Sequence, residues 1–166
     1  MKHAMHYIWS ALVLGTLAVS LALASDKKAD PKMEEMMKKV QEAGTPGAAH
    51  KALEPFVGDW NAEVKMFMDP SAPPSVSKAT AKSTWAMDGR FVQQEFKGEF
   101  MGKPFQGLAF TGYDNIRKKY SSSWLDDMST GMFMSEGQAD KAGKVFTFEG
   151  THSCPETGET HKAAKQ

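Results

Sequence analysis

Apolar side chains between residues 31 and 53 recur at the spacing of a helix. Asp30 and Pro31 are typical of a helix N-cap followed by a first-turn proline. The apolar positions that follow fall at i, i+3, i+4 and i+7: Met33, Met36, Met37 and Val40. Gly44 is a natural end for this helix, and a second short helix begins at Pro46 and runs through Leu53. The pattern predicts a short N-terminal helical segment.

The spacing of apolar residues changes to two after Gly58. This alternation predicts a first strand from Trp60 to Met68 and a second from Ser77 to Met87. Two strands follow the second, one on each side of the turn "MGKP", and three more are predicted at 119–126, 131–138 and 144–154, with turn sequences between them. Strands joined by turns predict a mainly β fold, an antiparallel up-and-down meander. Such a meander tends to close into a barrel, since closure removes exposed strand edges.

The turn at Asp88-Gly89 predicts how two of these strands pair. Pairing Met87 with Arg90 places apolar and small residues on one face and an opposite-charge pair on the other. The predicted pairs are Trp85 with Val92, Ser83 with Gln94, Ala81 with Phe96, Lys82 with Glu95 and Thr84 with Gln93.

The next turn, "MGKP", is treated in the same way, with Phe100 paired with Phe105. This register places Gln94 opposite Thr111 and Val92 opposite Tyr113. The shared inner face is then mostly aromatic, with polar residues embedded in it: Trp85, Val92, Phe96, Phe100, Phe105 and Tyr113, with Ser83, Gln94 and Thr111.

This inner face, with Trp124 of the predicted strand at 119–126, supplies the candidate ligand-binding residues. They are Trp85, Ser83, Gln94, Phe96, Thr111, Tyr113 and Trp124. Small-molecule pockets are mostly apolar with a few placed polar groups, and this set has that composition. The alternative is that the polar groups hydrogen-bond one another in a filled core. Both interpretations remain open at this point.

The first 24 residues have the layout of a secretory signal. Lys2 precedes an apolar stretch, and Ala22 and Ala24 are spaced as A-x-A. We predict cleavage after Ala24, a helical segment over 25–55, and a β-barrel domain over 56–166. The protein is then periplasmic or secreted. We expect no integral membrane anchor, because the apolar stretch is short for a span of ~20 residues.

Charge and cysteine content argue against nucleic-acid binding and exclude an intrachain disulfide. Lysine and arginine total 20, as do aspartate and glutamate, and this balance argues against nucleic-acid binding. Cys154 is the only cysteine, so no intrachain disulfide can form. We expect no cofactor and no metal.

Three kinds of chemistry are weaker alternatives. Catalysis could use carboxylates at Glu63, Asp114, Asp126 or Asp127, although turns and caps explain these residues equally well. Copper could bind thioethers spaced by two, at Met66 and Met68 or at Met132 and Met134. Haem could bind through His152. Methionine is more often core filler, and we predict no catalytic residue.

A set of short motifs resembles a known family. The ordered string G-x-W (Gly58, Trp60), G-R-F, G-x-x-F-x-G, G-Y-D and W-x-D lies between residues 50 and 154. It resembles a bacterial family defined only as a domain of unknown function, whose members are similar to the calycins. The resemblance implies a lipocalin-like β-barrel and no established reaction. It also implies that Gly58 and Trp60 lie at the closed end of that barrel.

The chain end differs from the pattern of those relatives. A closed barrel needs ~8 strands, and the sequence gives seven with a stub at Glu159–His161. We therefore expect a barrel that lacks its C-terminal strands, from truncation or with an open edge. The leading hypothesis is an exported, non-catalytic protein that binds a small apolar or amphipathic ligand. The alternative is an envelope interaction or structural protein that forms a homodimer through the open edge.

Overall fold

The computed structural model describes residues 30–67, 71–154 and 157–165. The predicted signal peptide, residues 1–24, and the predicted copper ligand Met68 lie outside these ranges. The chain divides into two units, residues 1–39 and 40–166. Helix α1 (Pro31–Gly44) starts in the first unit and ends in the second, and it begins as predicted, because the Asp30 carboxylate accepts a hydrogen bond of 2.9 Å from the Lys32 N–H.

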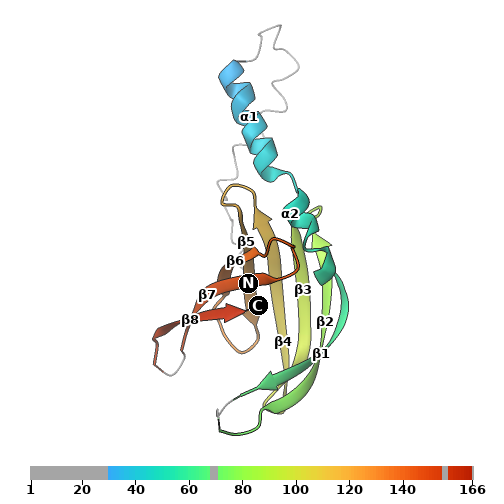
Figure 1. The fold of residues 1–166 in the computed structure, drawn as a ribbon. Coiled ribbons are helices and arrows are strands. Elements are labelled where there is room, and N and C mark those ends of the chain that lie inside the picture. Colours follow the sequence, from blue (N-terminus) through green and yellow to red (C-terminus); the bar gives the residue numbers. More distant parts are fainter. Residues whose placement is uncertain (1–29, 68–70, 155–156, 166) are drawn as a thin grey trace, which may run out of the picture. The chain divides into compact units, whose positions relative to one another are not determined.

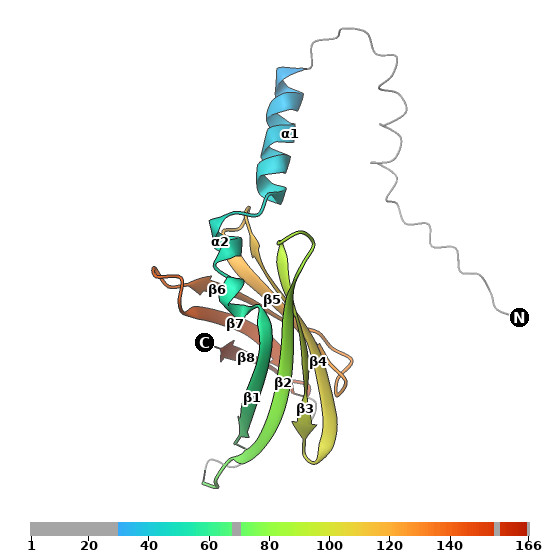
Figure 2. The ribbon, with the colours of Figure 1, turned by 90° about the vertical axis from the view of Figure 1, so that its right-hand side faces the viewer.

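The second unit contains one antiparallel sheet in which each strand pairs with its neighbour in sequence (Figure 1). Its strands are β1 (Gly58–Met66), β2 (Ser75–Ala86), β3 (Phe91–Phe100), β4 (Lys103–Asp114), β5 (Lys119–Asp126), β6 (Phe133–Ala139), β7 (Phe146–Ser153) and β8 (Thr160–Lys165). This confirms the mainly β meander. Within the described part of the chain the order runs from β1 to β8 and does not return to β1, so the sheet is not closed (Figure 2).

The eighth strand is longer than the stub expected from the sequence. Strand β8 pairs with β7 from Ser153 opposite Thr160 to Phe148 opposite Lys165. The expectation that the C-terminal strand is missing is therefore wrong. Lysine and alanine are poor strand formers, but the free edge of β7 provides backbone partners that outweigh this local preference.

One of the two predicted registers is confirmed and the other is shifted. The β2–β3 pairs are those predicted, from Ala81 opposite Phe96 to Trp85 opposite Val92. Between β3 and β4 the predicted register is wrong by two residues, because Phe100 pairs with Lys103 across a two-residue turn. Both turn residues have positive φ, 51° at Met101 and 77° at Gly102. A shift of two keeps every side chain on its predicted face.

A helical segment packs against the inner face of the sheet. The helix predicted from Pro46 to Leu53 is shorter, α2 (Ala48–Lys51), and a separate 3-10 turn (Glu54–Phe56) follows it. Leu53 between them is 0% exposed. It belongs to a core formed with four residues of three strands, β3, β5 and β7: Val92, Tyr120, Phe146 and Phe148, with Trp85 of β2 packed beside them.

Hydrogen bonds between distant residues hold this segment in place. The Tyr120 hydroxyl donates to the Ala49 carbonyl at 3.0 Å. The indole N–H of Trp85 donates to the Glu54 carboxylate at 2.9 Å. The segment and the sheet are therefore one packed body.

In the G-x-W motif, Gly58 has the backbone role expected of it, and Trp60 does not have the role expected of it. Gly58 has φ of 135°, which L residues rarely adopt, so glycine is required where the chain enters β1. Trp60 lies on the predicted face, opposite Ala81. Its ring is 48% exposed and its N–H donates to the Phe56 carbonyl at 3.1 Å. It does not seal a barrel end, because β1 is an edge strand.

Candidate functional site

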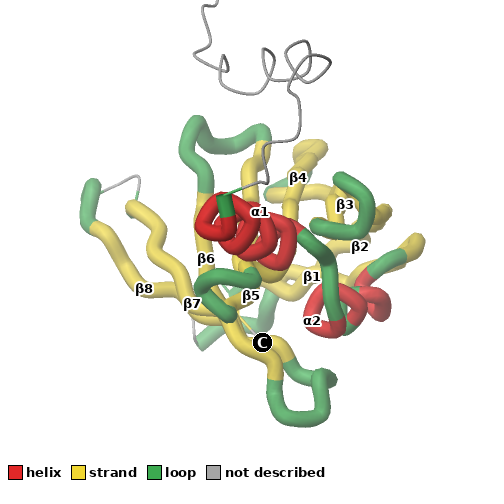
Figure 3. The backbone as a smooth tube through the Cα atoms, turned by 90° about the horizontal axis from the view of Figure 1, so that it is seen from above, coloured by secondary structure: helices red, strands yellow, loops and turns green. Residues whose placement is uncertain are grey.

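The inner face of the sheet lines a cavity of about 570 Å³. Its lining comes from the 3-10 turn, from β2 to β5, from β7 and from the loop before β7: Phe56, Ser83, Val92, Gln94, Ala109, Thr111, Trp124, Lys144, Val145, Phe146 and Phe148. Figure 3 shows these strands from above. The cavity has the size and the mostly apolar lining typical of small-molecule sites.

Exposure distinguishes the floor of the cavity from its mouth. Ser83, Val92 and Ala109 on the floor are buried. Phe56 is 41% exposed and Val145 is 39% exposed, so these two side chains stand where the cavity meets solvent.

Polar side chains on the inner face bond to one another. The Gln94 side-chain amide donates to the Ser83 hydroxyl at 3.2 Å, and the Thr111 hydroxyl donates to the Ser122 hydroxyl at 3.2 Å. No buried side-chain nitrogen or oxygen in the described part of the chain lacks a hydrogen-bond partner. The polar groups are paired, as the second interpretation expects, but they lie beside a cavity and not in a filled core.

An aromatic cluster lies beside the cavity. The Trp124 ring stacks on Phe105 at 6.3 Å between centroids and meets Phe96 edge-on at 5.9 Å. Its N–H donates to the Asp126 carboxylate at 2.8 Å. Gly107 faces this ring so closely that a Cβ there would lie 2.3 Å from it. Trp124 is therefore held by Phe105, Phe96, Asp126 and Gly107, and it also lines the cavity.

His50 connects the helical segment to β4. Its ring is 5% exposed and meets Tyr113 edge-on at 5.8 Å. Nδ1 accepts a hydrogen bond of 3.1 Å from the Gly47 N–H, which places the ring proton on Nε2. Burial lowers the pKa of His50, although a hydrogen bond to the Tyr113 backbone opposes the shift. The neutral ring is a structural element.

Four of the seven residues predicted from the sequence line the cavity. These are Ser83, Gln94, Thr111 and Trp124. The other three, Trp85, Phe96 and Tyr113, share the same face but pack against the helical segment or the aromatic cluster. The structure thus brings the polar members together with one aromatic residue.

The lining residues outside β2 to β5 were not among the predicted candidates. They are Phe56, Lys144, Val145, Phe146 and Phe148. The spacing of Phe146 and Phe148 by two was a usable signal for an inward-facing strand. Lys144 had no such signal, because its position depends on the loop between β6 and β7.

The candidate catalytic carboxylates have local structural partners. The Asp114 side chain accepts hydrogen bonds from the Ile116 and Arg117 N–H groups, at 2.8 and 3.0 Å. These two bonds lower the pKa of Asp114, the Arg117 bond most.

The other three candidate carboxylates also have local hydrogen-bond or ion-pair partners. Asp126 accepts from Met128 and Ser129, each at 3.0 Å, and Asp127 accepts from the Gln106 N–H at 3.2 Å. Glu63 forms an ion pair of 3.0 Å with Lys65. None of the four carboxylates is among the cavity residues in the described ranges.

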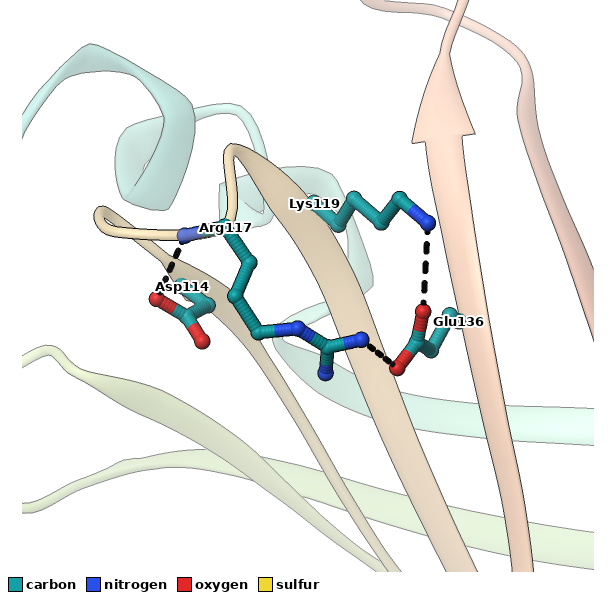
Figure 4. A network of polar contacts seen from close by, with 4 residues as sticks. All are labelled: Asp114, Arg117, Lys119 and Glu136. Atoms are coloured by element: carbon teal, nitrogen blue, oxygen red, sulfur yellow. Dashed lines mark hydrogen bonds and ion pairs between the residues drawn. The ribbon is translucent and has the colours of Figure 1, made fainter.

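The outer face carries a charged cluster (Figure 4). Glu136 on β6 pairs with Arg117 and, at 3.3 Å, with Lys119. These bonds lower the pKa of Glu136, the one from Arg117 most. Lys119 and Glu136 also line a shallow hollow of about 430 Å³ with Glu149. Exposed ion pairs of this kind contribute little to stability.

The candidate metal and haem ligands lie elsewhere. His152 is exposed on β7 opposite His161 of β8, with ring centroids 5.9 Å apart. Met132 and Met134 are 57% and 54% exposed. Within the described ranges, no three His, Cys, Asp or Glu side chains are grouped as a metal site. No helix of the described chain is long and apolar enough to cross a membrane.

The fold and the cavity define a class of protein, an open antiparallel β sheet that surrounds an apolar cavity. A family model described as "Protein of unknown function (DUF1579)" matches residues 45–166, and the chain belongs to this family. Comparisons with curated proteins and with solved structures gave no match.

Proposed function

We propose that this protein is an exported, lipocalin-like binding protein that holds a small apolar or amphipathic molecule on the inner face of its sheet. One observation carries the proposal, the cavity of about 570 Å³ with apolar walls. Burying the apolar body of a ligand against Val92, Phe146 and Phe148 contributes about 25 cal/mol per Å² removed from water. The paired polar groups at Ser83 and Gln94 can exchange partners with a polar atom of the ligand.

The test uses a neutral fluorescent probe, N-phenyl-1-naphthylamine, so that charge plays no part. The expected result is one bound probe per chain, with quenching of tryptophan fluorescence. Ala109→Phe fills the floor of the cavity and is expected to weaken binding roughly ten-fold or more. Ser123→Phe is the matched control, because Ser123 alternates with Trp124 and lies on the outer face.

A second variant tests the cavity independently, in case Ala109→Phe does not fold. Val145→Trp narrows the mouth at a partly exposed position, where a larger side chain is tolerated. Thermal unfolding of each variant confirms that it is folded. Absence of probe binding to the native protein, or equal binding by all three variants, would refute the proposal.

Export is a part of this proposal that can be tested separately. Residues 1–24 have the composition of a signal peptide. Expression of the full chain in a bacterial host is expected to give an exported form whose mass corresponds to cleavage after Ala24. A form that keeps these residues and stays in the cytoplasm would contradict it.

The edge strand β1 gives little support to the alternative, in which two chains pair through their open edges. The outer face of edge strand β1 carries Asp59, Glu63 and Lys65, and charged residues on an edge strand oppose pairing. Light scattering after size exclusion is expected to give the mass of a monomer. A concentration-independent dimer would favour the alternative.

A further inference from the structure

Among the described residues that line the cavity, one side chain is charged, Lys144 in the loop between β6 and β7. Lys144 is exposed, and its ammonium group has no ion pair within the described part of the chain. A free cation at the edge of an apolar cavity is a specific arrangement, because most surface lysines have no apolar site beside them.

The backbone around Lys144 is fixed by one carboxylate. Asp140 accepts hydrogen bonds from the N–H groups of Lys144 at 2.7 Å and Val145 at 3.1 Å. The Asp140 N–H in turn donates to the Val145 carbonyl at 2.8 Å. These bonds close the loop and hold Lys144 beside the mouth residue Val145. The carboxylate makes its hydrogen bonds with the backbone, and in the described part of the chain no ion pair joins it to the Lys144 ammonium group.

The polar groups deeper in the cavity do not compete for a charged ligand group. Gln94 bonds to Ser83, and Thr111 bonds to Ser122. An anion placed there would lose its hydration without meeting a positive charge. An anion at the mouth keeps contact with water and meets the ammonium group.

We infer that the ligand is an anionic amphiphile, with its carboxylate on Lys144 at the mouth and its hydrocarbon chain on the cavity floor. This rests on the proposed binding function and deepens it by naming the class of ligand and its direction. The chain lies between Phe56 and the aromatic residues Phe146 and Phe148, and Val145 covers the junction of head and chain.

The experiment compares two ligands of equal length, dodecanoate and dodecanol, by isothermal titration calorimetry. The native protein is expected to bind dodecanoate roughly three- to five-fold more tightly than dodecanol, because the exposed ammonium group adds a charge pair of modest strength to the same apolar contact. Lys144→Met keeps the apolar stem and is expected to reduce the preference to near unity. Lys141→Met is the matched control, since this exposed lysine is in the same loop and outside the cavity lining.

The outcomes separate this inference from the function on which it rests. Equal affinity for both ligands in the native protein, or a preference that survives in Lys144→Met, overturns the inference and leaves the binding function standing. Binding of neither ligand to the native protein overturns both. A loss of preference in Lys141→Met equal to that in Lys144→Met also overturns it, because the charge then acts without a defined position.

Discussion

Gly107 determines the position of the Trp124 ring, and a single methyl group there tests this directly. In Gly107→Ala the new Cβ would lie 2.3 Å from the indole, whereas ordinary contact begins at 3.4 Å. The ring must therefore move by about 1.1 Å. Phe105 and Phe96 contact the ring at centroid distances of 6.3 and 5.9 Å, so it cannot move without disturbing them.

The energetic cost follows from two contributions. Overpacking costs about 1–3 kcal/mol, and weakening the 2.8 Å bond from Trp124 to the Asp126 carboxylate adds about 1 kcal/mol more. We expect Gly107→Ala to lower the free energy of unfolding by about 2–4 kcal/mol, measured by urea titration with circular dichroism. The cavity wall moves with the ring, so probe affinity is expected to fall as well.

Two controls make this result interpretable. Gly131→Ala adds the same methyl group where nothing lies within 4 Å, and its stability is expected to be unchanged within about 0.5 kcal/mol. Trp124→Phe removes the obstructing part of the ring, so Gly107→Ala is expected to cost less in that background than in the native protein. Equal stability of Gly107→Ala and Gly131→Ala, or equal costs in both backgrounds, would refute the reasoning.

Two further predictions concern the helical segment. Leu53→Ala is expected to lower the free energy of unfolding by about 2–5 kcal/mol, because Leu53 is 0% exposed. Val40→Ala, at a position 59% exposed, is its control in the same urea titration, and equal losses would contradict the packing. The pKa of His50 is lowered from its ordinary value of 6.5, so the unfolded chain binds more protons than the folded one below that pH. Stability is therefore expected to fall as the pH drops below about 6.5, and less so in His50→Gln, whose amide oxygen can still accept from Gly47. The same pH dependence in both proteins would exclude His50 as its origin.

Local turn chemistry explains which part of the fold could be predicted. Asp88-Gly89 defines the β2–β3 register because both residues adopt positive φ with little cost, at 55° and 79°. At the next turn the same conformation is adopted by Met101, a residue that rarely has positive φ, so its sequence did not reveal the turn. The predicted β3–β4 register was wrong by two residues, and because a shift of two keeps each side chain on the same face, the predicted inner face is correct.

The candidate site could be predicted only where it depends on alternation along a strand. Ser83, Gln94, Thr111 and Trp124 were found because strand residues two apart share a face. Lys144 could not be found in this way, because a loop residue is placed by its own hydrogen bonds, here those of Asp140. Strand β8 was underestimated for a related reason, since its pairing depends on β7 and not on its own residues.

The open sheet has a consequence for how the chain folds. In the described part of the chain every strand pairs with its neighbour in sequence, so most contacts can form within single hairpins. Closing the sheet would join β1 to β8, whose first residues Gly58 and Thr160 are about a hundred positions apart. Closing a loop of that length costs roughly 2 kcal/mol more entropy than closing one of about ten residues. A meander that stays open avoids this step, and its folding can proceed by adding one hairpin at a time to the β2–β3 turn.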